Sequence, residues 1–378
     1  MVGIGETTYY KRGTSPVPEF VLACEAILKA ADDAGIDVQE IDGFASYSND
    51  RNDPVRIGNA LGVRDMAFTN MFWGGGGGGV CGAVGNAAAA LVAGYAKYVV
   101  AYRALAQGQF GRFGQSHATG AVTGAAAYVN PYGLMTPAQQ IALRTQRFMH
   151  EHGVTQDALA AISLASYAHA QRNPRAVMYG RPLTREDYDQ SRWIVEPFHL
   201  FDCCQENDGA AAVILTTAER ARDLQQKPAW VMGAAQGSDA RFSLPTHNAP
   251  DYPSANFKPV ARRLYEMAGI GPRDVDVAQV YENFTGGTML SMVEHGLCEP
   301  DEVQEFCTEA NLTWPDGGLP LNTSGGNLAE CYMHGLELVN EAVRQVRGTS
   351  TCQVEGAEIA LVAGGPVTAP VSDLILHG

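Results

Sequence analysis

Hydrophobic and polar positions along this 378-residue chain follow both helical and strand periods. An amphipathic pattern that ends at a glycine predicts a helix at about 18–34, and a second such pattern predicts a helix at 255–268. A β-like segment precedes each helix, at Val2 to Tyr10 and at Trp230 to Gly237, and a short strand is expected after each. The chain therefore predicts strands and helices in alternation, which is typical of an α/β protein.

The same order of elements occurs twice because the chain contains an internal repeat. Residues 34–42 (AGIDVQEID) align without a gap on residues 268–276 (AGIGPRDVD), where the two helices end. Two β-α-β-α-β units of this kind predict two sheets with helices on their faces and a shared helical layer between them. Each unit is completed by a helix that leads to a strand, at 81–93 and 98–102 in the first copy and at 334–346 and 358–362 in the second.

A long insertion at about 105–200 interrupts the first unit. It is rich in prolines and polar residues, and Pro137 begins a helical stretch that reaches about His152. Loops of this length in a compact domain are usually lids or binding walls. We expect an N-terminal half at 1–225, which includes this inserted cap, and a C-terminal half at 226–378.

Composition and charge are those of a soluble enzyme. Hydrophobic residues make up 46% of the chain and charged residues 18%, which suffices for a large core. No apolar run reaches the length of about 18 residues that a membrane span needs, and no secretory pattern is visible, so we expect a cytoplasmic protein. The formal net charge of −15 argues against nucleic acid and anionic membranes as partners.

The eight cysteines show no paired Cys-x-x-Cys spacing. They indicate reduced thiols and argue against a zinc ribbon or disulfide framework within this chain. His150 and His152 have a spacing that could hold a metal, but no acidic or cysteine cluster completes the set. The sequence therefore predicts no metal site.

Six consecutive glycines, Gly74 to Gly79, precede the helix at 81–93. No acidic residue follows at the distance that a dinucleotide site requires. In one interpretation the glycines leave space for a bulky substrate and N–H groups at a helix N-terminus for an oxyanion. In the other they allow close packing of the following small-residue helix, and both interpretations can hold.

Two segments carry the candidate chemistry: Tyr281-Glu282-Asn283-Phe284, and the stretch 322–335 that reads NTSGGNLAECYMHG. They resemble two catalytic loops of the thiolase superfamily, especially its sterol-carrier-protein branch, with motifs His-Asp-x-Phe and Asn-Pro-Ser-Gly-Gly-x-x-x-x-Gly-His-Pro-x-Gly. Both histidine positions hold tyrosine here, Tyr281 and Tyr332. The resemblance implies the five-layered αβαβα thiolase fold, with the insertion covering the site.

The cysteines of the thiolase family are missing from their positions. The nucleophile position falls on Gly77, and the second catalytic cysteine falls at about Ala363. Without a thiolate at either place, acyl transfer through a covalent thioester has no attacking group. The resemblance thus implies the thiolase scaffold with a different reaction.

The tyrosine loops are most similar to those of bacterial steroid side-chain aldolases of the lipid-transfer-protein group. These enzymes cleave a 17-hydroxy steroid with a three-carbon CoA thioester into a 17-ketosteroid and propionyl-CoA. The resemblance implies retro-aldol cleavage with Tyr281 and Tyr332 as acid and base and with Glu282, Asn283 and His334 in support. No cofactor is expected beyond the coenzyme A that the substrate carries. The candidate substrate or oxyanion contacts are the loop glycines Gly76, Gly77, Gly325, Gly326, Gly364 and Gly365.

Two other functions stay open: a noncatalytic lipid or acyl-CoA carrier, and a cysteine-free thiolase-like condensing enzyme. The resemblance also implies a homodimer formed across the edge of the N-terminal sheet, where a strand such as Tyr98 to Tyr102 can pair with its mate. It further implies a separate companion with a zinc ribbon and an OB-like barrel, linked to an acyl-CoA hydratase.

Overall fold

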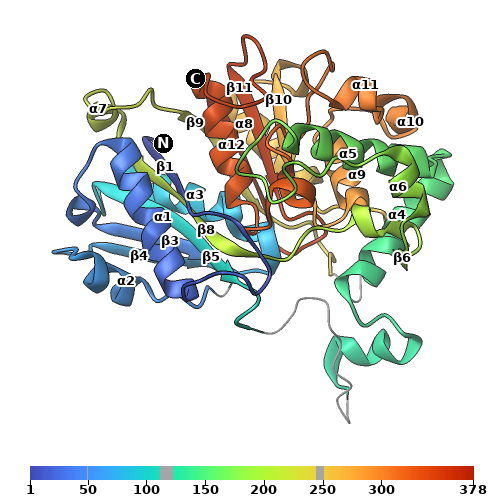
Figure 1. Ribbon diagram of the computed structural model, residues 1–378, viewed down its shortest axis with the longest axis horizontal. Coiled ribbons are helices and arrows are strands. Elements are labelled where there is room, and N and C mark those ends of the chain that lie inside the picture. The colour runs from blue at the N-terminus through green and yellow to red at the C-terminus, as the bar shows by residue number, and fades with distance from the viewer. Residues whose placement is uncertain (49, 111–121, 244–250) are drawn as a thin grey trace.

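Two mixed β-sheets enclose a layer of two helices, and further helices cover the outer face of each sheet (Figure 1). This computed structural model describes residues 1–48, 50–110, 122–243 and 251–378. The layers follow the order helix, sheet, helix, sheet, helix. This order confirms the predicted five-layered α/β architecture.

The described residues of the N-terminal half form a six-stranded sheet of β1 (Gly3–Glu6), β2 (Tyr10–Lys11), β3 (Gly43–Tyr47), β4 (Phe68–Phe72), β5 (Tyr98–Ala106) and β8 (Asn207–Thr216). The strand order is β1-β8-β5-β3-β4, and β2 pairs with β8. β3 runs parallel to β4 and β5, whereas β8 runs antiparallel to β1 and β5.

The place of β5 in this sheet corrects the strand that we expected at a dimer edge. β5 is hydrogen-bonded to β3 on one side and to β8 on the other. Its backbone groups are therefore already paired, and Tyr98 to Tyr102 cannot pair with a second copy. At that side of the sheet β4 is the edge strand.

The C-terminal sheet contains β9 (Trp230–Gly237), β10 (Val277–Val280), β11 (Ile359–Gly364) and β12 (Val371–His377). Its order is β10-β11-β12-β9, with β10 parallel to β11 and the other neighbours antiparallel. The strands predicted at 230–237 and 358–362 are both confirmed.

The central layer consists of α3 (Val80–Val92) and α12 (Leu336–Arg347). α3 contacts β3, β4 and β5 of one sheet and β9 and β12 of the other, and α12 lies between β8 and β10. Because both helices are buried between sheets, small residues are needed where backbones approach closely. A Cβ atom on Gly82 of α3, for example, would lie 2.4 Å from the ring of Phe72.

The outer helices are α1 (Glu19–Ala34) and α2 (Pro54–Leu61) on the N-terminal sheet, and α8 (Lys258–Ala268) and α9 (Thr285–Glu294) on the C-terminal sheet. α1 and α8 end at Gly35 and Gly269, whose φ angles of 72° and 71° are left-handed, as predicted for glycine C-caps. No helix in the described ranges is long and apolar enough to cross a membrane.

Strands β5 and β11 carry buried apolar residues on both faces because helices cover both faces. On β5, Val99 and Leu105 face the central helices, whereas Val100 and Tyr102 belong to the cluster under α1. The same alternation occurs on β11, where Val362 and Leu361 face opposite layers. Near-continuous apolar runs are typical of sheets buried on both sides.

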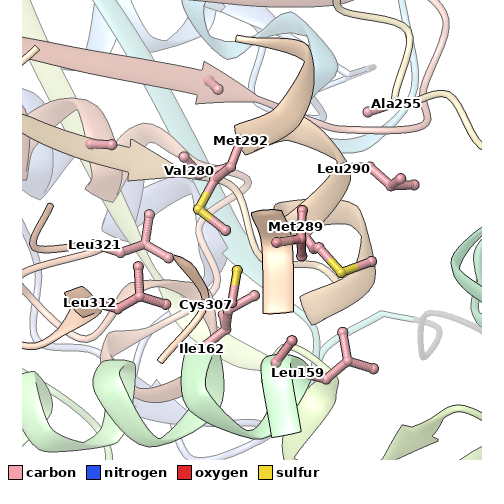
Figure 2. Packing of buried hydrophobic residues seen from close by; sticks show 14 of the residues in the cluster. Leu159, Ile162, Ala255, Val280, Met289, Leu290, Met292, Cys307, Leu312 and Leu321 are labelled. Carbon is pink, nitrogen blue, oxygen red and sulfur yellow. The ribbon is translucent and has the colours of Figure 1, made fainter. Parts of the chain in front are cut away.

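From Pro137 on, the insertion packs against the C-terminal half rather than against the sheet in which it begins and ends (Figure 1). Figure 2 shows Leu159 and Ile162 of the insertion in one apolar cluster with Met289 and Met292 of α9. The insertion therefore forms a wall beside the end of the C-terminal sheet. Its elements are α4 (Pro137–His152), α5 (Gln156–Ala170), α6 (Arg185–Gln190), β6 (Trp193–Val195) and β7 (Phe198–His199), and the short helices elsewhere are α7 (Ala218–Ala221), α10 (Val303–Phe306) and α11 (Glu309–Leu312).

Candidate active site

The two tyrosines that the sequence singled out meet in the core between the halves. Tyr281 directly follows β10, and its N–H donates to the carbonyl of Ala363 on the neighbouring strand at 2.9 Å. Tyr332 follows a π-helical turn, Gly326–Glu330, and its N–H donates to Oδ1 of Asn207 at 2.9 Å. The hydroxyl of Tyr281 donates to the hydroxyl oxygen of Tyr332 at 2.7 Å.

Both phenols are buried and hold their protons. Burial is the main cause that raises the pKa of Tyr281 and of Tyr332 well above the usual value near 10. The hydrogen bond between them raises the pKa of the donor Tyr281 and lowers that of the acceptor Tyr332. The Cys204 thiol lies within hydrogen-bonding reach of the Tyr332 hydroxyl. The arrangement is a line of donors that runs from Tyr281 through Tyr332 toward Cys204.

Gly77, at the family's nucleophile position, makes room for a phenol ring. A Cβ atom there would lie 2.0 Å from Cε2 of Tyr281. The interpretation that this glycine leaves space for substrate is therefore wrong, because Tyr281 occupies that space. The alternative of close packing is confirmed, since a Cβ on Gly78 or Gly79 would also meet neighbouring atoms at 2.2 and 2.7 Å.

The glycines at the end of β11 bring their backbone close to the segment that carries Gly77. A Cβ on Gly365, whose φ is 67°, would lie 2.0 Å from the backbone nitrogen of Gly78, and one on Gly364 would lie 3.0 Å from the Gly77 carbonyl oxygen. The N–H of Gly325 donates to the carbonyl of Asn322 at 2.9 Å and so belongs to the turn. The oxyanion role of these loops stays a prediction.

Gly326 lies against Glu282, which is completely buried. The Glu282 carboxylate accepts hydrogen bonds from the Ser166 hydroxyl at 2.6 Å and from the Asn327 N–H at 3.0 Å. Burial raises its pKa to about 7, although these donors oppose the shift. Glu282 thus joins helix α5 of the insertion to the turn that precedes Tyr332, and it does not bond to the phenols.

Of the other predicted supporting residues, Asn283 contacts a neighbour of the phenol pair, whereas His334 contacts the Tyr332 ring itself. The carbonyl of Asn283 accepts the N–H of Cys204 at 3.0 Å, which places that thiol at Tyr332. The His334 ring stands edge-on to the Tyr332 ring, with centroids 5.1 Å apart and planes at 87°. Burial is the main cause that lowers the pKa of His334 well below its usual value, so its ring is neutral.

The motifs did not indicate four further residues at the site: Tyr47, Cys204, Asn207 and Glu337. The Tyr47 hydroxyl donates to the carbonyl of His334 at 3.1 Å. The Glu337 carboxylate accepts the N–H of Met333 at 3.1 Å, one residue after Tyr332. Cys204 and Asn207 follow the insertion, and Asn207 is the first residue of β8. Asn207 pairs with Lys11 of β2 at the end of the sheet, and no local sequence signal records this pairing.

A metal ion in a protein is held by several ligand side chains that lie close together. No group of three or more His, Cys, Asp or Glu side chains arranged to hold a metal ion occurs among the residues whose placement is described. His152, one of the pair with metal-like spacing, contacts Asp301 at 2.7 Å.

Comparisons with known proteins agree with this geometry. The family model described as Thiolase C-terminal domain-like matches residues 238–376. The 17-hydroxy-3-oxo-4-pregnene-20-carboxyl-CoA lyase of Mycobacterium tuberculosis is 40% identical over 100% of this chain and 98% of the relative. The steroid side-chain-cleaving aldolase of Thermomonospora curvata is 39% identical over 100% of this chain and 97% of the relative.

Solved structures show the same relation. A structure described as an Ltp2-ChsH2(DUF35) aldolase superimposes with a TM-score of 0.92 at 38% identity, covering 100% of this chain and 97% of that one. Human mitochondrial 3-ketoacyl-CoA thiolase superimposes with a TM-score of 0.72 over 100% of this chain and 98% of that one, at 13% identity. The second likeness shows the fold alone.

Proposed function

The chain belongs to the family of thiolase-fold steroid side-chain-cleaving aldolases, and we propose that it cleaves a 17-hydroxy steroid C22-CoA thioester by a retro-aldol reaction. The products are a 17-ketosteroid and propionyl-CoA. The observation that carries this proposal is the 2.7 Å hydrogen bond between Tyr281 and Tyr332 at a site whose nucleophile position is Gly77. The reaction breaks a carbon–carbon bond beside a thioester and needs proton transfer, but it needs no nucleophile.

The two phenols can relay a proton without forming a free phenolate. The steroid hydroxyl passes its proton to the Tyr281 oxygen, while Tyr281 passes its own proton along the hydrogen bond to Tyr332. The Cα–Cβ bond breaks, the β-carbon becomes the ketone, and the electron pair moves to Cα and the thioester, where enolate character develops. Tyr332 gives its own proton to Cα in the same step in which it accepts the proton of Tyr281, so its oxygen never carries two protons. The relay leaves each tyrosine with one proton, as it began.

The direction of the hydrogen bond between the tyrosines indicates which of them accepts the steroid proton and which protonates Cα. Tyr281 is the donor within the pair, so its oxygen is the one that can accept the steroid proton. Tyr332 directs its own proton out of the pair, toward Cys204 in the free protein, and this is the proton that Cα receives. Backbone N–H groups of the loop glycines, Gly76 foremost, are proposed to stabilise the enolate oxygen. No metal or additional cofactor takes part in this scheme.

Product analysis in deuterated water tests the proposal. We expect a 17-ketosteroid and a propionyl-CoA that carries one deuterium at Cα, both identified by mass spectrometry. Tyr332→Phe and Tyr281→Phe should abolish most product formation, while Tyr265→Phe, a change outside the site, should leave it unchanged. A longer acyl-CoA formed from acetyl- or malonyl-CoA would identify a condensing enzyme instead. Substrate that is bound but recovered intact would identify a carrier.

For the assembly we propose a homodimer across the edge strand β4. Large apolar side chains are exposed on and beside this strand: Trp73 is 77% exposed, Val92 90% and Tyr95 65%. Tyr95 stacks on Phe68, so its side chain belongs to the surface at the start of β4. Burying such a patch together with an unpaired edge is favourable. Light scattering should give twice the chain mass, and Trp73→Lys should shift the protein toward monomer.

A companion protein of the zinc-ribbon and OB-barrel type, linked to an acyl-CoA hydratase, is the second assembly proposal. It is supported by the similar structure whose description includes ChsH2(DUF35) beside the aldolase. Co-expression followed by an activity assay tests this part: activity of the chain alone that equals the activity of the mixture would remove the need for a companion. The cytoplasmic location stays a prediction.

A further inference from the structure

We infer that Asn327 and Glu337 form a clamp that positions the two tyrosines, and that Glu337 must be neutral for the reaction to proceed. The inference rests on the proposed function, because it concerns the same pair of phenols. Asn327 lies within the stretch 322–335 and Glu337 just after it, but the sequence patterns assigned neither residue a role, and neither is hydrogen-bonded to a tyrosine hydroxyl among the residues that the structure describes. Both act as positioning residues.

Asn327 is bound to the residue that follows Tyr281. Its Oδ1 accepts the N–H of Glu282 at 2.8 Å, and its own N–H donates to the Glu282 carboxylate at 3.0 Å. The side chain and backbone of one asparagine therefore fix the chain immediately after the first tyrosine.

Glu337 is bound to the residue that follows Tyr332. Its Oε1 accepts the N–H of Met333 at 3.1 Å and also a hydrogen bond from Nδ2 of Asn327. Asn327, Glu282 and Glu337 are all completely buried. A continuous line of hydrogen bonds thus runs from the neighbour of Tyr281 to the neighbour of Tyr332, and it holds the two loops in register.

The second oxygen of Glu337 is buried and has no hydrogen-bond partner among the residues that the structure describes. Burying an ionised carboxylate with one oxygen unpaired costs much free energy, whereas burying a protonated carboxyl in the same place costs far less. Burial raises the pKa of Glu337 to about 8, and hydrogen bonds from its own N–H and that of Met333 reduce the shift. At neutral pH the group is therefore mainly uncharged.

The titratable groups around Glu337 come from several elements and are neutral or acidic. They are Glu330, Cys331 and Tyr332 on the segment before its helix α12, Tyr281 after β10, Cys204 shortly before β8, Tyr47 on β3 and Tyr9 before β2. A negative charge on Glu337 would raise the phenol pKa values further and would repel the negative charge of the developing enolate. Ionisation of Glu337 should therefore stop the reaction.

Glu337→Gln tests this directly, since glutamine keeps an oxygen for the two donors and cannot ionise. In the wild-type protein we expect kcat/KM for ketone release to fall about tenfold per pH unit above roughly pH 8. In Glu337→Gln we expect no fall between pH 7 and 9, with activity at pH 7 within about threefold of wild type. A fall near pH 8 that persists in this variant would overturn the role of Glu337.

Glu341→Gln is the matched control on the same helix. Glu341 is also completely buried, but its carboxylate accepts hydrogen bonds from Thr323 and Ser350 rather than from Met333. This variant should keep the wild-type fall near pH 8. Asn327→Ala, which breaks the clamp, should lower kcat at least a hundredfold with little change in KM, and wild-type kcat in Asn327→Ala would overturn the clamp.

A measurement without substrate separates this inference from the proposed function. Because the pKa of Glu337 is raised in the folded state from 4.5 to about 8, its contribution to stability is complete below pH 4.5 and is lost as the pH rises to about 8. The unfolding temperature of Glu337→Gln should therefore rise relative to wild type between pH 5 and pH 8. A difference that stays constant over this range would refute the neutral Glu337 even for a protein that releases no ketone. If the unfolding temperatures change with pH as expected but the wild-type protein releases no ketone, the proposed function is refuted and the neutral Glu337 is not.

Discussion

The two tyrosines of the site are held in different ways. Tyr281 continues a regular strand, its N–H bonds to the neighbouring strand, and its ring lies on Gly77. Tyr332 lies in an irregular segment after a π-helical turn, and its N–H depends on the side chain of Asn207. One phenol is thus fixed by the sheet, whereas the other is fixed by side chains from distant parts of the chain. The difference predicts that added volume at Gly77 disturbs Tyr281, whereas loss of one polar side chain disturbs Tyr332.

The hydroxyl groups themselves are expected to give the largest effects. Tyr281→Phe and Tyr332→Phe should each lower kcat by roughly 10²- to 10⁴-fold, or about 3 to 5 kcal/mol in the barrier, because each removes one member of the proton relay. The fold should stay intact, as checked by circular dichroism. Full activity in either variant would show that its hydroxyl is not in the relay.

The support of Tyr281 by Gly77 can be broken by one methyl group. Gly77→Ala would place a Cβ within 2.0 Å of the Tyr281 ring, so the ring or the loop must move. Overpacking of this kind costs about 1–3 kcal/mol of stability. We expect a lower unfolding temperature and at least a hundredfold loss of kcat. Gly94→Ala serves as a surface control with open space around it, although its positive φ makes that change slightly unfavourable as well. Wild-type kcat in Gly77→Ala would mean that the ring position is not critical.

The support of Tyr332 by Asn207 can be removed without touching the phenol. Asn207→Ala leaves the buried N–H of Tyr332 without its acceptor, which costs about 1–3 kcal/mol. We expect kcat to fall roughly tenfold to a hundredfold, and the pH profile to keep its shape because no ionisable group is lost. If kcat is unchanged, the loop of Tyr332 does not need this contact, and the comparison between the two tyrosines loses its basis.

The smallest effect is expected at Cys81, on the central helix just after the nucleophile position. Its thiol is buried against the carbonyl of Val362 at 3.6 Å, and burial is the main cause that raises its pKa well above the usual value. Cys81→Ala should keep most of the activity. Intact-protein mass spectrometry of the wild type with substrate should detect no acyl adduct, and a stable adduct on any cysteine would restore a thiolase mechanism.

Local sequence patterns predicted the elements well because these elements carry their own signals. The helix expected at 18–34 is Glu19–Ala34, and the one at 255–268 is Lys258–Ala268. Periodicity and a terminal glycine suffice to define such helices. The resemblance of the two loops also brought Tyr281 and Tyr332 to one site, and the structure places their hydroxyls in contact.

Local sequence patterns do not predict contacts that depend on the order of the strands or on the path of the insertion. Nothing in the sequence of Tyr98 to Tyr102 distinguishes a central strand from an edge strand, and the order β1-β8-β5-β3-β4 decides it. Asn207 reaches Tyr332 only because β8 returns beside β5 after the insertion. The sequence also left open whether the space at Gly77 holds substrate or allows close packing, because it does not show which side chain fills that space.

The contact between Gly77 and the Tyr281 ring also limits how one reaction could change into the other. A cysteine at position 77 and a tyrosine at position 281 would occupy the same volume. If Gly77→Cys comes first, the new thiol displaces the Tyr281 ring. If Tyr281→His comes first, the protein has neither the phenol nor the thiol. The two chemistries are therefore separated by at least two coupled substitutions, and a laboratory conversion should begin from the double variant Gly77→Cys with Tyr281→His.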